Sequence, residues 1–145
     1  TKMHIAQAKG CSPIINAIDN NNDFIEPVIP ETIAKSIAIG NPADGLNSVN
    51  LVNKTNGTGT SVSENEIIQG IRLLAETEGI FTETAGGVVI ASLVKLSKQN
   101  KLSSDEKTVC LITGNGLKTP DVVSNLETLD IDSKSSNLDE ILSKV

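Results

Sequence analysis

The 145-residue chain has almost no aromatic side chains, with two Phe, no Tyr and no Trp. Its hydrophobic core must therefore be built from aliphatic residues. It also lacks the clustered Lys and Arg that contact a nucleic-acid backbone, and its net charge of −6 disfavours an anionic membrane surface as well. No run approaches the roughly 18 apolar residues of a membrane span. We therefore expect neither a nucleic acid nor a membrane as a partner.

Patterns for metal binding, disulfides and histidine chemistry are missing too. Cys11 and Cys110 are isolated and show no CxxC spacing, so we expect two reduced thiols, as is typical of a cytoplasmic protein. The single histidine, His4, argues against a catalytic triad. No GxxxxGK[ST] or GxGxxG motif follows a predicted strand, which argues against a nucleotide phosphate loop. These patterns alone provide no complete catalytic set.

What is present is an alternation of short apolar runs and amphipathic segments. The runs that predict strands are residues 3–8, 80–81, 109–112 and 129–133. The predicted helices are residues 13–18, 46–54, 64–78, a helix within residues 79–100 that has Gly86 and Gly87 in its first turn, and 137–144. Residues 31–39 are expected to form a short helix or turn, and residues 55–61 a loop. This order predicts an α/β fold with a partial, open and largely parallel sheet and packing helices.

The helix after Ser63 has the clearest signals. Ser63 and Glu66 fit a capping box, and the apolar residues that follow fall on one helical face up to Gly79. The next helix is apolar nearly all round, which is typical of a helix buried between layers. Gly86 and Gly87 in its first turn are poor helix formers, so we expect them to let another backbone or a flat ligand come close.

Two predicted strand ends carry polar side chains and glycines. One is the sequence FTETAGG, residues 81–87, and the other is TGNG, residues 113–116. In a parallel sheet both would open on the same carboxyl edge, where ligands bind. A tight turn that binds nothing is the alternative for each.

The order of these motifs resembles the C-terminal part of threonine synthase. The matching motifs are EGIFTETAGGV and TGNGLKT, preceded by MHIAQAKGCSPI and SIAIGNPADG, and together they cover residues 2–123. The resemblance implies the C-terminal part of a two-domain, fold-type II pyridoxal-phosphate enzyme of the tryptophan-synthase-β-like group. Residues 1–123 would then be the C-terminal α/β portion of that fold, and residues 124–145 a tail.

The resemblance also implies a reaction and a site. Threonine synthase converts O-phospho-L-homoserine and water to L-threonine and phosphate, with pyridoxal 5'-phosphate as cofactor. Thr113 matches the hydroxyl residue that hydrogen-bonds the pyridine nitrogen in this family. Glu83 matches the acidic residue of the E-x-A-G-G turn, expected near the ring, and Gly114 would let the backbone turn beneath the cofactor.

Two family features have no match in this chain. The lysine that binds the cofactor covalently and the loop that grips its phosphate belong to the family's N-terminal portion. Because residue 1 is Thr and a predicted strand begins almost at once, we expect a fragment of a longer protein. Because the lysine is missing, we expect this fragment to be inactive without its N-terminal portion. The alternatives are a non-catalytic ligand-binding or regulatory α/β module, or a serine or threonine dehydratase of the same group. A homodimer is left open.

Overall fold

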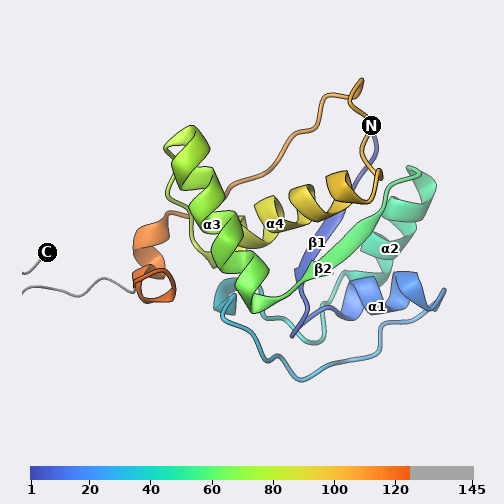
Figure 1. Cartoon of the computed structure of the whole chain (residues 1–145). Helices are drawn as coiled ribbons and strands as arrows, with labels where there is room; N and C mark the ends of the chain where they lie inside the picture. The colour runs from blue at the N-terminus through green and yellow to red at the C-terminus, as the bar shows by residue number, and fades with distance from the viewer. Residues whose placement is uncertain (125–145) are drawn as a thin grey trace, which may run out of the picture.

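The computed structural model describes residues 1–124 and shows a small sheet among helices (Figure 1). Its two strands are β1 (Ile5–Ala8) and β2 (Gly59–Val62). The helices are α1 (Pro13–Asp19), α2 (Gly45–Lys54), α3 (Glu64–Glu78) and α4 (Thr84–Lys98). Three short 3-10 turns are η1 (Lys35–Ile37), η2 (Gly116–Lys118) and η3 (Pro120–Val122). Within residues 1–124, no helix is long and apolar enough to cross a membrane.

The sheet has helices on both of its faces. β1 and β2 pair in parallel, with Ile5 opposite Gly59 and Ala8 opposite Val62. Because side chains alternate along a strand, Gly59 and Val62 belong to opposite faces. Gly59 lies against the Ile15 side chain of α1, whereas Val62 packs in the core with residues of α3 and α4. Parallel strands covered on both faces agree with the predicted α/β class.

Strand β2 occupies part of the segment that was predicted to be a loop. The prediction of a loop over residues 55–61 is wrong from Gly59 onward. The sequence GTSV has only one strongly apolar residue, so its periodicity gives little signal. Thr60 and Val62 are nevertheless buried, because pairing with β1 places them inside the body of the protein.

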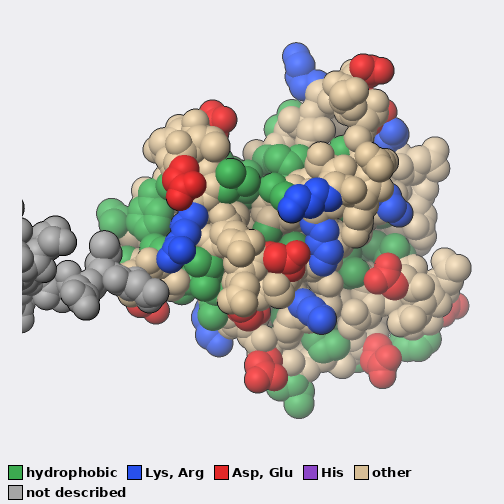
Figure 2. Space-filling model, viewed as in Figure 1, with side chains coloured by type: hydrophobic (Ala, Val, Ile, Leu, Met, Phe, Trp, Pro, Cys, Tyr) green, Lys and Arg blue, Asp and Glu red, His purple; other side chains and the backbone are tan. Residues whose placement is uncertain are grey.

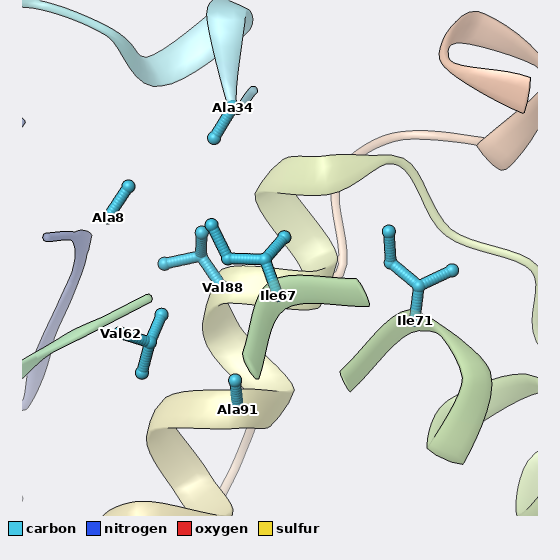
Figure 3. Close-up of a cluster of buried hydrophobic side chains, with 7 residues drawn as sticks. All are labelled: Ala8, Ala34, Val62, Ile67, Ile71, Val88 and Ala91. Atoms are coloured by element: carbon cyan, nitrogen blue, oxygen red, sulfur yellow. The ribbon is translucent and has the colours of Figure 1, made fainter. Parts of the chain in front are cut away.

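The hydrophobic core is aliphatic, as the composition predicted. It contains seven buried side chains that come from both strands, α3, α4 and the residue before η1 (Figure 3). They are Ala8, Ala34, Val62, Ile67, Ile71, Val88 and Ala91. Ile67 has no exposed surface, and Figure 3 shows it beside Val88 where α3 and α4 meet.

Helix α3 begins and ends where the sequence predicted. The Glu66 amide donates to the Ser63 hydroxyl at 3.4 Å, and the Ser63 amide donates to the Glu66 carboxylate at 2.7 Å. This confirms the capping box. The hydrogen bond from the Ser63 amide favours the charged carboxylate and lowers the pKa of Glu66. Gly79 ends the helix with φ of 68°, a left-handed conformation that favours glycine.

Helices α3 and α4 approach closely through their glycines. A Cβ atom on Gly70 would overlap the carbonyl oxygen of Gly87, and one on Gly87 would overlap the carbonyl oxygen of Ile67. Another backbone, rather than a flat ligand, is therefore what Gly87 accommodates. The neighbouring Gly86 lies against the Thr82 side chain.

The N-terminal predictions are confirmed in outline. Helix α1 starts at Pro13 and ends at Asp19, within one residue of the prediction. Helix α2 covers the predicted residues 46–54 and starts one residue earlier. The predicted short helix or turn over residues 31–39 contains η1.

Two predicted strands do not form within the described residues. Residues 80–81 and 109–112 lie outside any strand, and Thr82 makes only an isolated bridge to Asn115. Residues 109–112 have the β-branched composition of a strand, but nothing in residues 1–124 pairs with them. The predicted elements at 129–133 and 137–144 lie outside the described residues, as does the predicted tail apart from Ser124.

Candidate functional site

The two glycine-containing motifs meet in space. We call residues 81–83 together with residues 113–116 the junction. The Glu83 amide donates to the Gly114 carbonyl at 3.1 Å, and the Gly116 amide donates to the Phe81 carbonyl at 3.0 Å. The bridge between Thr82 and Asn115 is antiparallel. The structure thus brings the predicted motifs together, although not as the carboxyl ends of two parallel strands.

Thr82 holds the junction together from inside. Its side chain is 1% exposed, and its hydroxyl donates to the Gly114 carbonyl at 2.9 Å. Its side chain also fills the space that a Cβ on Gly86 would need. Thr82 therefore links the start of α4 to the turn that follows Thr113. The sequence analysis did not single it out, and a hydroxyl residue directly before the E-x-A-G-G pattern was the only available signal.

Glu83 is an acidic residue buried at the start of α4. It occupies the N-cap position of that helix, and its side chain is 7% exposed. The carboxylate lies over Gly114, and the Lys118 ammonium is 3.8 Å from it. The N-terminal end of a helix carries partial positive charge, which also favours a carboxylate at this position. The Glu83 side chain makes no capping hydrogen bond to α4, and within residues 1–124 its ion-pair partner is the exposed Lys118.

Thr113 is one of three exposed residues of the junction, together with Phe81 and Asn115. Among residues 1–124, its hydroxyl has no hydrogen-bond partner, whereas the next residue, Gly114, is fixed by Thr82 and Glu83. The backbone at Thr113 is thus anchored on one side while its side chain is available to a molecule outside this chain.

The glycines of TGNG serve close approach and not left-handed turns. In residues 1–124, Gly79 alone among the glycines has a positive φ. A Cβ on Gly114 would overlap the Glu83 carboxylate, and one on Gly116 would overlap the Phe81 ring. Asn115 accepts a hydrogen bond from the Leu117 amide at 2.9 Å and so caps η2.

A separate groove of about 440 Å³ lies between α3 and α4. Its lining comes entirely from these two helices and includes Arg72, Glu76, Lys95 and Lys98. Figure 2 shows acidic and basic side chains interspersed on the face in view. No residue of the junction lines this groove.

The remaining reactive groups are dispersed. Cys11 and Cys110 are both free, and burial raises the pKa of each thiol. Within residues 1–124, no three metal-ligating side chains of the His, Cys, Asp or Glu types gather to hold an ion. The junction is thus where the chemistry suggested by the sequence collects.

Comparison with known proteins shows the family of this chain. Residues 1–114 match the family described as pyridoxal-phosphate dependent enzyme. The chain belongs to this family. The family match reaches both motifs of the junction as far as Gly114, and it confirms the resemblance derived from the sequence.

Its similarity to individual proteins is consistent along the chain. Over 97% of its length it is 36% identical to a threonine synthase of Bacillus sp. (strain ULM1). Over 99% of its length it is 37% identical to a threonine synthase of Methanocaldococcus jannaschii. The chain spans 38% and 36% of these two relatives, respectively.

A solved structure confirms the fold class. Maize serine racemase superposes on 99% of this chain with a TM-score of 0.59, and the match covers 38% of that protein. The sequence identity is 15%, so this likeness concerns the fold alone. The chain has part of the fold-type II architecture that was predicted.

Proposed function

We propose that this chain supplies the C-terminal part of a pyridoxal-phosphate-dependent threonine synthase. The complete enzyme would convert O-phospho-L-homoserine and water to L-threonine and phosphate. The observation that supports this proposal is the identity of 36–37% to proteins named threonine synthase over 97–99% of the chain. Since the chain spans 36–38% of their length, the rest of the enzyme would be an N-terminal portion that these 145 residues do not include.

The junction fits the nitrogen end of a pyridoxal ring. When bound, pyridoxal phosphate supplies an electron sink for carbanions formed on an amino-acid substrate. Thr113 would donate a hydrogen bond from its hydroxyl to the ring nitrogen, because that hydroxyl is exposed and has no partner among residues 1–124. A neutral hydroxyl would hold the nitrogen without the ion pair that an aspartate would provide.

Glu83 and Gly114 would complete this end of the site. Gly114 would keep the backbone below Thr113 close to α4, because only a residue without a side chain leaves room for the Glu83 carboxylate. Glu83 would place its carboxylate beside the ring, with Lys118 as its ion-pair partner. We also propose that the protein works in the cytoplasm, since both of its cysteines are free thiols.

The isolated chain should not turn over the substrate. The family's covalent lysine is expected in the N-terminal portion, and without it the cofactor has no covalent link and the Cα proton no base. The proposed partner is therefore that portion, together with the small-molecule substrate. A homodimer of the complete assembly stays an open part of the proposal.

A substrate panel on the assembly tests the function. The 145-residue chain is co-expressed with the part of the M. jannaschii threonine synthase that it does not match, and released phosphate and ammonia are measured. Phosphate released from O-phospho-L-homoserine supports the proposal. Ammonia released from threonine or serine, without phosphate release, would identify a dehydratase. Neither product, with a ligand still bound, would favour the non-catalytic module.

Two variants at Thr113 test the site within the same assay. Thr113→Ser keeps the hydroxyl and should retain most of the activity. Thr113→Val keeps the shape and removes the donor, so kcat should fall by about 10-fold to 100-fold, the effect of losing one good hydrogen bond in a dry site. Equal activity of the two variants would remove Thr113 from the proposed site.

A further inference from the structure

Three hydrogen bonds join the two parts of the junction in the part of the chain that the structure describes. Two are backbone bonds: the Glu83 amide donates to the Gly114 carbonyl at 3.1 Å, and the Gly116 amide donates to the Phe81 carbonyl at 3.0 Å. The third comes from a side chain, since the Thr82 hydroxyl donates to the Gly114 carbonyl at 2.9 Å. Thr82 therefore supplies the side-chain donor that links the two motifs.

Gly114 is the hinge on which the direction of Thr113 depends. A glycine has more backbone freedom than any other residue, so an unrestrained Gly114 would let the preceding Thr113 change its direction. A carbonyl oxygen has two lone pairs, and the Gly114 oxygen accepts from two donors, the Glu83 amide and the Thr82 hydroxyl. Removing the Thr82 donor would leave this carbonyl with a single hydrogen bond from the described residues.

The Thr82 side chain is itself held in place. A Cβ on Gly86 would overlap the Thr82 hydroxyl oxygen, so the missing side chain at Gly86 makes room for Thr82. Threonine is branched at Cβ, which restricts its χ1 rotamers. Thr82 is 1% exposed and has no surface left for a ligand. It can therefore affect a bound molecule only through the residues that it contacts.

Thr113 depends on its backbone for its direction, because its exposed hydroxyl has no hydrogen-bond partner within residues 1–124. We propose that Thr82 is a positioning residue for the cofactor. Its hydrogen bond to Gly114 fixes the direction in which Thr113 presents its hydroxyl to the ring nitrogen. This inference rests on the proposed function, and it adds a buried supporting hydroxyl behind the exposed one.

Two variants of Thr82 in the co-expressed assembly test this role. Thr82→Val keeps the branched shape and removes the donor, so kcat should fall by about fivefold, the effect of one buried hydrogen bond. The ¹⁵N signal of the pyridine nitrogen in labelled pyridoxal phosphate should shift toward that of Thr113→Val. Thr82→Ser restores the donor and should return both kcat and the signal close to the parent values.

A measurement without the cofactor shows whether the hinge has loosened. In the assembly before pyridoxal phosphate is added, hydrogen exchange of the Glu83 amide should be about fivefold faster in Thr82→Val, because its acceptor Gly114 is then less well fixed. Exchange in the middle of α3 should stay unchanged, which excludes a general loss of stability.

Thr119→Val is the matched control. The Thr119 hydroxyl is also buried and follows the same TGNG motif, but it has no hydrogen-bond partner within residues 1–124. Its removal takes away a hydroxyl of the same kind without breaking a hydrogen bond. We expect kcat within about twofold of the parent and an unchanged ¹⁵N signal.

A double-mutant cycle separates positioning from a general structural role. Since Thr82 acts through the Thr113 hydroxyl, Thr82→Val should lower kcat by less than about twofold once Thr113→Val is present. Two independent effects would instead multiply. Multiplied effects of the two substitutions would contradict the proposal, because Thr82 would then act by another route.

Failure of this inference and failure of the proposed function give different results. If Thr113→Val loses activity while Thr82→Val behaves like Thr119→Val, the positioning role of Thr82 alone is overturned. The same holds if Thr82→Ser is as impaired as Thr82→Val, because packing and not the donor would then matter. An assembly that neither binds pyridoxal phosphate nor releases phosphate would contradict the proposed function, and this inference with it.

Discussion

The helical body, residues 5–98, and the unpaired segment of residues 107–113, which we call the open strand, place the same types of aliphatic residue in opposite environments. In the helical body, Ile67 and Val88 are at most 1% exposed, and β1 and β2 pair with each other. In the open strand, Val109 is 76% exposed and the backbone groups have no partners within residues 1–124. The helical body is therefore stabilised by contacts inside this chain. The open strand has the sequence of a buried element without the neighbours that would bury it.

This contrast shows that composition sets the environment a segment requires, whereas topology decides whether one chain can provide it. The two regions meet at the junction, where Thr82 and Glu83 from the helical body hold Gly114 at the end of the open strand. The candidate site is thus anchored to the helical body and lies next to the open strand.

The largest difference between the regions should appear on truncation to alanine. Ile67→Ala removes a side chain with no exposed surface and should lower the free energy of unfolding by about 3 kcal/mol. Leu111→Ala removes a side chain that is 71% exposed and should change it by less than about 0.5 kcal/mol. Urea unfolding of the isolated chain measures both. Similar losses for the two variants would mean that the open strand is already packed in solution.

Enlarging a glycine between α3 and α4 should cause the next largest loss of unfolding free energy. Gly70→Val forces a branched side chain against the Gly87 backbone and should cost about 2 kcal/mol. The matched variant Gly79→Ala meets no atom within 4 Å, but its φ of 68° is strained for alanine, so it should cost about 1 kcal/mol. The same unfolding experiment compares them. A larger loss of unfolding free energy for Gly79→Ala would show that the close approach of α3 and α4 matters less for stability than the left-handed conformation at Gly79.

Removing the N-cap of α3 should have a smaller effect. Ser63→Ala deletes the hydroxyl that accepts from the Glu66 amide and should cost about 1 kcal/mol of unfolding free energy. Ser97→Ala, an exposed serine near the end of α4, is the control and should stay within about 0.5 kcal/mol of the parent. Helix content and thermal unfolding, followed by circular dichroism, report both variants. Equal melting temperatures of these two variants would contradict the role of the capping box.

The smallest expected effect is the pH dependence of the same cap. The lowered pKa of Glu66 means that its contribution to stability is complete above the ordinary carboxyl value of 4.5 and is lost as pH falls through the folded-state value. Glu66→Gln should therefore reduce the slope of stability against pH below that value. Glu106→Gln, at the exposed ion pair with Lys2, is the matched control. An unchanged slope of stability against pH in Glu66→Gln would contradict a stabilising role of the Glu66 carboxylate in the cap.

The elements that depend on local signals could be predicted from the sequence. The capping box, Gly79 and Pro13 fixed the ends of α3 and the start of α1 because each acts on neighbouring residues. Strand β2 could not be predicted, because its polar sequence becomes a strand only by pairing with β1. The strand predicted at residues 109–112 does not form for the converse reason. Its composition is that of a strand, but no segment within residues 1–124 pairs with it.

The candidate site was predictable in composition and not in geometry. The motifs that contain Glu83 and Gly114 were identified, and the structure brings them together. Their antiparallel bridge and the buried Thr82 hydroxyl were not predicted, because both depend on contacts between residues about 30 positions apart in the sequence. The roles of Thr113, Glu83 and Gly114 toward a cofactor stay predictions.

The most direct test of the proposed site is the ¹⁵N NMR signal of the pyridine nitrogen in labelled pyridoxal phosphate bound to the co-expressed assembly. If the Thr113 hydroxyl donates to that nitrogen, the signal should be that of a neutral, hydrogen-bonded nitrogen. It should then shift in Thr113→Val and stay nearly unchanged in Thr113→Ser. A signal that is identical in the parent and in Thr113→Val would contradict the placement of Thr113 against the ring.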